Sequence, residues 1–312
     1  MVSERDVEDI EQRLKKYSLK ISGYLTEKAN RNANVPLSLY ALSLQNVHVF
    51  MGFVLAGVCP LDYLIQLKTL REEINDVISF IDSNEFTEYT LQELLAELSV
   101  RLKHFMEFIG HCYGIDLDMQ IVIPFGVPDG TSKLVLDLDL PEPLSGLSTD
   151  KPIGEQIAET VEDLWDYFAK LFDFIYRKTG QDWRLSTALL VLSMIELHRI
   201  MMVVLKDKCP DLLQEHGKAL ETILGEVMKF FRGKAKPDKD EVTKLFDMIN
   251  YRLKYFLEFL AKCLGEDLEL KVETGEGGAP QISVVRYGPL PSLPLQGPQE
   301  GGEDHGKEEG GA

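Results

Sequence analysis

Hydrophobic residues along this chain recur mainly at steps of three and four positions, the spacing of an amphipathic α-helix. Residues 37–60 differ, because they carry no charge and their apolar side chains fall on every side of a helix. A helix that is apolar all round is covered by neighbours on every side. The pattern therefore predicts a buried central helix that ends at Cys59–Pro60, since proline disfavours helical geometry in the residue before it.

The same pattern returns 150 residues later, at 187–210. The matched pairs include Leu42 and Leu192, Ser43 and Ser193, His48 and His198, Met51 and Met201, and Cys59 and Cys209. A second region, residues 101–117, matches residues 252–268 at a shift of 151. Two independent matches at nearly the same shift predict a tandem duplication.

A membrane span is the alternative interpretation of the central stretch, because about 20 apolar residues suffice to cross a bilayer. Glu196 and Arg199 lie in the middle of the second copy. A charge at that depth costs roughly 3 kcal/mol or more. The sequence therefore favours a buried helix of a soluble protein, with no membrane as partner.

Helical periodicity predicts three more helices around each central one. They cover residues 6–28, 62–81 and 90–112 in the first half, and 157–175, 211–231 and 240–263 in the second. Thr90 and Glu93 form a capping box that predicts a helix start at residue 90. Alternating apolar residues at 118–123, 133–139, 268–274 and 281–287 predict a β-hairpin at the end of each half. The expected fold is mostly α: a tandem duplication of a four-helix unit, each followed by a small β-hairpin, forming an intramolecular pseudo-dimer.

This reading divides the chain into four parts. Residues 1–147 form the first helical repeat with its hairpin, 148–154 a linker, and 155–288 the second repeat with its hairpin. Residues 289–312 are rich in Pro, Gly and acidic residues, and their apolar content is too small to offset the entropy of ordering. We expect this last part to be a flexible acidic tail.

Charge and composition narrow the range of partners. The formal net charge is -18, a field that repels nucleic-acid backbones and anionic lipid. The N-terminus lacks the apolar core of a secretory signal, so the expected location is the cytoplasm. A basic run at 229–239 remains as a route to nucleic acid, and a solvated loop is the alternative reading of it. Phosphate loops, dinucleotide-binding loops and zinc-protease or hydrolase motifs are absent, and no cofactor is predicted.

The repeated histidines, His48 and His198, are the first candidate site. Each shares a helix face with apolar residues, and two such faces could meet and bind a metal ion or exchange a proton. The alternative is a neutral imidazole in a helical core, which needs only a hydrogen-bond partner for its polar atom.

A second candidate site lies on the predicted helix 90–112. His104, Glu107 and His111 are spaced at i, i+3 and i+7, so they share one side of the helix and offer zinc or iron ligands. The second copy keeps only the glutamate, Glu258. A solvated polar face is the alternative reading.

The four cysteines end predicted helices. Cys59 and Cys112 reach the same end of an up-down bundle, and so do Cys209 and Cys263. Each pair could form a disulfide if its α-carbons come within about 7 Å. The alternative is small buried thiols.

These observations point to a non-enzymatic helical interaction or assembly protein that acts through protein–protein contacts or self-association. Exposed hairpin edges would allow strand pairing between the halves or with another molecule. The rival hypothesis is a metal-binding protein or enzyme that uses His48 and His198. A nucleic-acid-associated factor using residues 229–239 is a third, less favoured reading.

Overall fold

The computed structural model describes residues 4–83, 87–117, 119, 121–124, 133–136, 151–180, 184–232, 238–274 and 280–289. The predicted, mostly helical fold is confirmed in this part of the chain, which forms eight helices and two β-hairpins. The first half contains α1 (Glu4–Lys28), α2 (Asn34–Leu55), α3 (Pro60–Ser83), α4 (Glu88–Cys112), β1 (Ile121–Pro124) and β2 (Lys133–Leu136). The second half contains α5 (Ile153–Lys178), α6 (Arg184–Leu205), α7 (Pro210–Arg232), α8 (Lys239–Cys263), β3 (Glu266–Thr274) and β4 (Pro280–Pro289).

The two apolar helices, α2 and α6, lie side by side at the centre of the fold. Both are long and apolar enough to cross a membrane, with mean hydropathies of 1.3 and 2.0. Inside the protein, 78% and 83% of their apolar windows are buried. Their all-round hydrophobicity is therefore matched by neighbouring helices on most sides, as expected for core helices.

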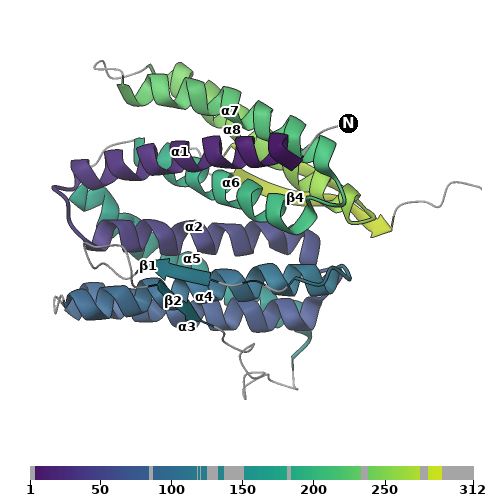
Figure 1. Cartoon of the computed structure of the whole chain (residues 1–312), viewed down its shortest axis with the longest axis horizontal. Coiled ribbons are helices and arrows are strands. Elements are labelled where there is room, and N and C mark those ends of the chain that lie inside the picture. The colour runs from purple at the N-terminus through teal and green to yellow at the C-terminus, as the bar shows by residue number, and fades with distance from the viewer. Residues whose placement is uncertain are drawn as a thin grey trace, which may run out of the picture.

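Helices α1 and α5 pack in exchanged positions. In Figure 1, α1 lies among α6, α7 and α8, and α5 lies with α2, α3 and α4. The main contacts of α1 are with α6 and α7, and those of α5 are with α2 and α3. Each four-helix group therefore contains one helix from the other half of the sequence. The division at residues 148–154 stays a prediction about the sequence and does not coincide with the packing units.

Close side-chain contacts hold α1 against α7. The Ile10 side chain is fully buried against Gly217 of α7, and the ring of Tyr24 stacks on Phe231 at 5.2 Å. At the surface, the guanidinium of Arg13 lies 2.6 Å from the carboxylate of Glu221. Burial supplies most of this stabilisation, because exposed ion pairs contribute only about 0–1 kcal/mol.

Helix α5 docks on the first half through buried apolar and polar contacts. Leu164 and Leu171 are buried, and the side-chain amide of Gln45 in α2 donates a hydrogen bond of 2.6 Å to the Leu164 carbonyl. Arg71 of α3 pairs with Asp163 at 2.8 Å. A buried polar bond of this kind fixes the register of two helices, because a shift would leave its groups without partners.

Replacing Gly217 with alanine tests the exchanged position of α1. The added Cβ would lie 2.5 Å from the Ile10 side chain and 2.9 Å from that of Met202. We expect Gly217→Ala to lower the free energy of unfolding by about 1–3 kcal/mol through overpacking. Urea unfolding measures the change. Gly225→Ala is the control on the same helix, because nothing lies within 4 Å of its Cβ, and it should stabilise by up to about 1 kcal/mol. Equal effects of both variants would contradict the α1–α7 packing.

The hairpins form two separate two-stranded antiparallel sheets, β1–β2 and β3–β4. Among the described strands, the hairpins of the two halves do not pair with one another. Each half uses a helix glutamate to hold the chain that follows. Glu107 of α4 accepts a hydrogen bond of 3.2 Å from the Met119 amide, and Glu258 of α8 accepts one of 2.8 Å from the Leu270 amide. The glutamates at these two matching positions therefore hold the following chain in the same way.

The start of α4 differs from its predicted position. The helix begins at Glu88 rather than Thr90, and its N-cap is Thr87. The Thr87 side chain accepts a hydrogen bond of 3.1 Å from the Thr90 amide. A threonine satisfies the same unpaired donors one turn earlier, so the capping box assigned to Thr90 and Glu93 was wrong by three residues. Helices α2 and α6 end at Leu55 and Leu205, four residues before the predicted ends at Cys59 and Cys209. Pro60 and Pro210 are the first residues of α3 and α7, where a missing N–H costs nothing.

Candidate functional site

The two repeated histidines lie in matching buried environments. The side chains of His48 in α2 and His198 in α6 are 0% and 1% exposed. Nδ1 of His48 lies 2.8 Å from the Leu44 carbonyl, and the ring stacks on Phe105 of α4 at 3.6 Å. His198 repeats this arrangement, with the Met194 carbonyl at 2.7 Å and Phe256 of α8 at 3.5 Å. Each imidazole therefore joins a central helix to the last helix of its half.

This geometry fixes the protonation of both rings. Because a carbonyl oxygen only accepts, Nδ1 carries the proton and donates, and Nε2 is left as the acceptor. Among the described residues, Nε2 of His48 and of His198 has no hydrogen-bond partner. Burial lowers the pKa of each histidine to about 3, against the smaller raising effect of the backbone hydrogen bond. Both histidines are thus neutral at physiological pH.

The structure does not assemble a metal site from these residues. Among the residues it describes, no group of three or more His, Cys, Asp or Glu side chains could hold a metal ion. The stacked phenylalanine occupies one face of each imidazole. The geometry matches the alternative reading, a neutral imidazole hydrogen-bonded within the helical core.

An arginine lies one turn before each of these phenylalanines; Arg101 is buried and Arg252 is half-buried. In the first half, Arg101 donates to Glu73 at 3.1 Å and to Gln66 at 2.9 Å. In the second half, Arg252 contacts the ring and the carbonyl of His216, which is 150 residues after Gln66. Burial raises the pKa of Glu73 to about 7, although the Arg101 guanidinium acts to lower it. Burial likewise lowers the pKa of His216 to about 4.

The histidines and glutamate of α4 do not converge on one site. His104 is 3% exposed, and its Nδ1 lies 3.5 Å from a guanidinium nitrogen of Arg101. Glu107 is engaged by the Met119 amide and by Lys103 at 3.4 Å, while His111 is exposed. The solvated face proposed for this helix therefore holds His111, and His104 belongs to the core.

The four cysteines form two disulfides. Cys59 is bonded to Cys112, and Cys209 is bonded to Cys263, with Cα–Cα distances of 6.1 and 6.2 Å. Each bond joins the residue before α3 or α7 to the last residue of α4 or α8. Of the two readings of the cysteines, paired or free, the structure therefore shows the paired one in both halves, at matching positions.

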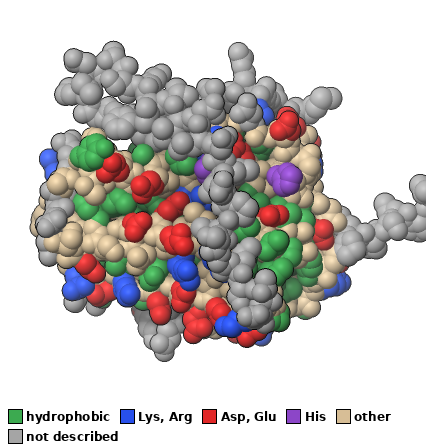
Figure 2. Space-filling model, turned by 90° about the horizontal axis from the view of Figure 1, so that it is seen from below, with side chains coloured by type: hydrophobic (Ala, Val, Ile, Leu, Met, Phe, Trp, Pro, Cys, Tyr) green, Lys and Arg blue, Asp and Glu red, His purple; other side chains and the backbone are tan. Residues whose placement is uncertain are grey.

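The basic run lies only partly within the described residues. Lys229 is exposed and pairs with Glu226 at 2.6 Å, and Arg232 is exposed. Lys234 and Lys236 lie outside the described residues. On the face shown in Figure 2, acidic side chains are spread among hydrophobic and basic ones. Such a surface does not favour a nucleic-acid backbone.

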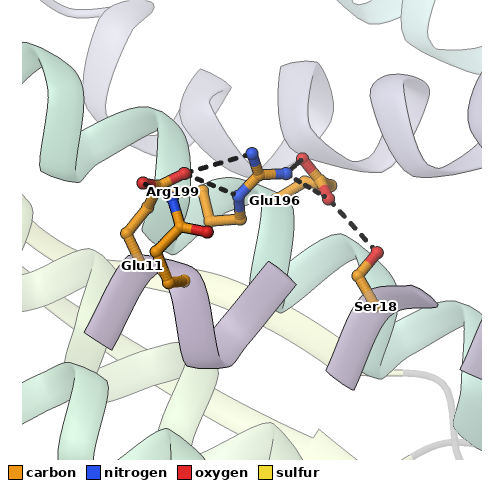
Figure 3. A network of polar contacts seen from close by, with 5 residues as sticks. Glu11, Ser18, Glu196 and Arg199 are labelled. Carbon is orange, nitrogen blue, oxygen red and sulfur yellow. Dashed lines mark hydrogen bonds and ion pairs between the residues drawn. The ribbon is translucent and has the colours of Figure 1, made fainter. Parts of the chain in front are cut away.

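A half-buried polar network joins α1 to α6 (Figure 3). The guanidinium of Arg199 lies 3.0 Å from Glu196 on its own helix and 3.2 Å from Glu11 on α1. Ser18 of α1 donates a longer hydrogen bond of 3.5 Å to Glu196. One arginine thus neutralises two carboxylates and ties α1 to the second half.

At the corresponding surface between α5 and α2, valines take the place of two of these charged residues. The positions 150 residues from Glu11 and Arg199 are Val161 and Val49. Further along α5, four aromatic rings contact one another in succession, with centroids 5.3, 5.9 and 6.0 Å apart; the first pair meets edge to face and the other two pairs are stacked. These rings, here termed the α5 aromatic stripe, belong to Trp165, Phe168, Phe172 and Tyr176. Their counterparts on α1 are Lys15, Ser18, Ser22 and Thr26.

The α5 aromatic stripe is partly open to solvent. Trp165 is 43% exposed, and the other three rings are half-buried. The sequence signal that could have identified the stripe is the comparison with α1, where the corresponding positions are polar.

Comparison with protein-family models, with curated proteins and with solved structures finds no match to this chain.

Proposed function

We propose that the chain is a non-enzymatic helical protein that acts through protein–protein contacts, with the α5 aromatic stripe as its contact surface. The observation that carries this proposal is the contrast between two corresponding surfaces. The α1 side carries a polar network, whereas the α5 side exposes part of a row of aromatic rings that contact one another.

The chemistry of the stripe suits a protein partner. Tryptophan and tyrosine are enriched among the residues that dominate binding energy at protein interfaces. The stripe extends over 12 residues of α5, and its two ends lie about 16 Å apart at 1.5 Å per residue. Three turns of helix with side chains at steps of three and four match an apolar ridge of a second helix. The partner is therefore a helical surface, on another protein or on a second copy of this chain.

We also propose that the two halves arose by tandem duplication. Matching features support this: the disulfides, the histidines stacked on phenylalanine, and the glutamates that hold the following chain. A duplicated scaffold explains how one half can keep a polar surface while the other acquires an aromatic one at corresponding positions.

Replacing Trp165 with lysine, the residue at the corresponding position of α1, tests the contact surface. We expect Trp165→Lys to weaken partner association at least tenfold, because an exposed aromatic contact is replaced by a charge. The free energy of unfolding should change by less than about 1 kcal/mol, as at other surface sites. Sedimentation velocity measures self-association. A photo-crosslinking amino acid at position 165, in cells that naturally make the protein, captures another partner.

The matched control is Leu19→Ser, which removes an isolated apolar side chain that is 66% exposed on α1. It should leave association unchanged, and a crosslinker at position 15 should give no product. Unchanged association of Trp165→Lys would overturn the proposed contact surface. A loss of several kcal/mol in stability would assign the stripe to the core instead.

A further inference from the structure

The charged residues of α5 are divided between the two ends of the helix. Residues 153–167 carry five acidic side chains and no basic one, whereas residues 168–178 carry three basic side chains and one acidic one. On α1 the charges are mixed. Residues 4–17 carry five acidic and four basic side chains, and residues 18–28 carry one acidic and two basic. The α5 aromatic stripe crosses the boundary between an acidic and a basic part of its helix, for which α1 has no counterpart.

The order of rings in the stripe is nearly the same from either end. Trp165 and Tyr176 are equally far from a midpoint between residues 170 and 171, and Phe168 and Phe172 lie two to three residues from it. If two α5 helices pack antiparallel about this midpoint, Trp165 of one copy lies opposite Tyr176 of the other, and Phe168 lies opposite Phe172. The stripe is therefore complementary to itself, as a twofold-symmetric interface requires.

We propose that two copies of this chain associate through antiparallel packing of their α5 aromatic stripes. The inference rests on the proposed function, since it names the partner of the same surface. Antiparallel packing sets the acidic part of each α5 beside the basic part of the other, and the two helix dipoles run in opposite directions. Parallel packing sets acidic beside acidic and basic beside basic, which is unfavourable. Charge thus selects both the partner and its direction.

One ion pair follows from this arrangement and occurs twice. Glu162 and Arg177 are exposed, lie on the same side of the stripe, and are each roughly two turns from its midpoint, one before it and one after it. Glu162 of one copy therefore lies opposite Arg177 of the other. The register also brings Asp173 near Asp166 of the second copy. Arg177 offsets that charge, because it pairs with Asp173 at 2.8 Å in its own helix.

Crosslinking through single added cysteines tests the antiparallel packing. All four native cysteines are paired, so one added cysteine supplies one free thiol per chain. Ala169 is exposed beside the midpoint of the stripe, and Ala158 is exposed on the same side of the helix 11 residues earlier. In the antiparallel pair the two copies of position 169 face each other, whereas those of position 158 lie about 37 Å apart along the helices. With a short bismaleimide, we expect Ala169→Cys to form a covalent dimer at least tenfold faster than the control Ala158→Cys.

Charge reversal tests the register. Glu162→Lys sets a lysine opposite Arg177, and Arg177→Glu sets a glutamate opposite Glu162. Each variant alone should therefore associate at least fivefold more weakly than the native chain. In an equal mixture of the two variants, both facing pairs are again of opposite sign. We expect the mixture to regain native association in sedimentation velocity, while circular dichroism shows that both variants stay folded.

The possible results separate this inference from the function on which it rests. Equal crosslinking at positions 169 and 158, or a mixture that associates as weakly as its components, would overturn the antiparallel pairing. A native chain that sediments as a monomer and forms no dimer through Ala169→Cys would overturn it as well. In that case, a product from the photo-crosslinker at position 165 would keep the stripe as a contact surface for another protein, and the absence of that product would overturn the proposed function too.

Discussion

Breaking the two disulfides is expected to lower the free energy of unfolding by about 4 kcal/mol for each bond. Each bond closes a long loop, with sequence separations of 53 and 54 residues between the joined cysteines. Closing a loop of this length removes entropy from the unfolded chain equivalent to about 4 kcal/mol at 25 °C. The combined loss is a large part of the 5–15 kcal/mol that stabilises a typical domain.

Urea unfolding with and without a thiol reductant measures this effect. Replacing Cys59 and Cys112 together by alanine should remove about half of it, and replacing Cys209 and Cys263 should remove the other half. A variant with all four replacements should be insensitive to the reductant. If the oxidised and reduced native proteins unfold at the same urea concentration, the cysteines act as buried thiols and the predicted stabilisation is wrong.

Acidification is expected to destabilise the fold through His48 and His198. Their pKa is about 3 in the folded protein, against an ordinary value of 6.5. Stability from the neutral rings is thus fully present above pH 6.5 and is lost as the pH falls from 6.5 toward 3, where only the unfolded chain takes up the proton. At pH 4.5, the contribution of each histidine to the free energy of unfolding should be about 2–3 kcal/mol smaller than at pH 7.

Glu73 acts in the opposite direction, so variants are needed to isolate the histidines. Its pKa is raised to about 7, and the stability it contributes is present below pH 4.5 and lost as the pH rises through 7. His216, with a pKa lowered to about 4, adds to the loss in acid. Between pH 7 and pH 4.5, the free energy of unfolding of His198→Gln should therefore fall by about 2–3 kcal/mol less than that of the native chain. The same is expected of His48→Gln. Chemical unfolding at both pH values gives these differences, and an unchanged pH dependence in both variants would refute the assignment.

Much of the local structure could be predicted from periodicity. The central helices are marked by their all-round hydrophobicity, and the surrounding helices by apolar seams such as Ile10, Leu14 and Ile21, all fully buried. The matched histidines pointed to equivalent core positions, although the stacking on Phe105 and Phe256 was not foreseen. These features depend on local sequence or on one face of a single helix. They can therefore be predicted from one sequence.

The exchange of α1 and α5 could not be predicted in the same way. Periodicity identifies which side of a helix is buried, but it does not name the helix that covers that side. The seams of α1 and α5 are alike, so either could pack on either half. The decisive contacts, such as Ile10 against Gly217 and Gln45 with the Leu164 carbonyl, join residues far apart in sequence.

Because of the exchanged helices, neither half can complete its four-helix group without the other. This affects folding during synthesis and the association of fragments after proteolysis. When the ribosome has made residues 1–147, the first four-helix group still lacks α5, so its assembly waits for the second half to emerge. A protease cut between residues 137 and 150 would break one peptide bond without freeing either fragment, because each fragment keeps a helix embedded in the other.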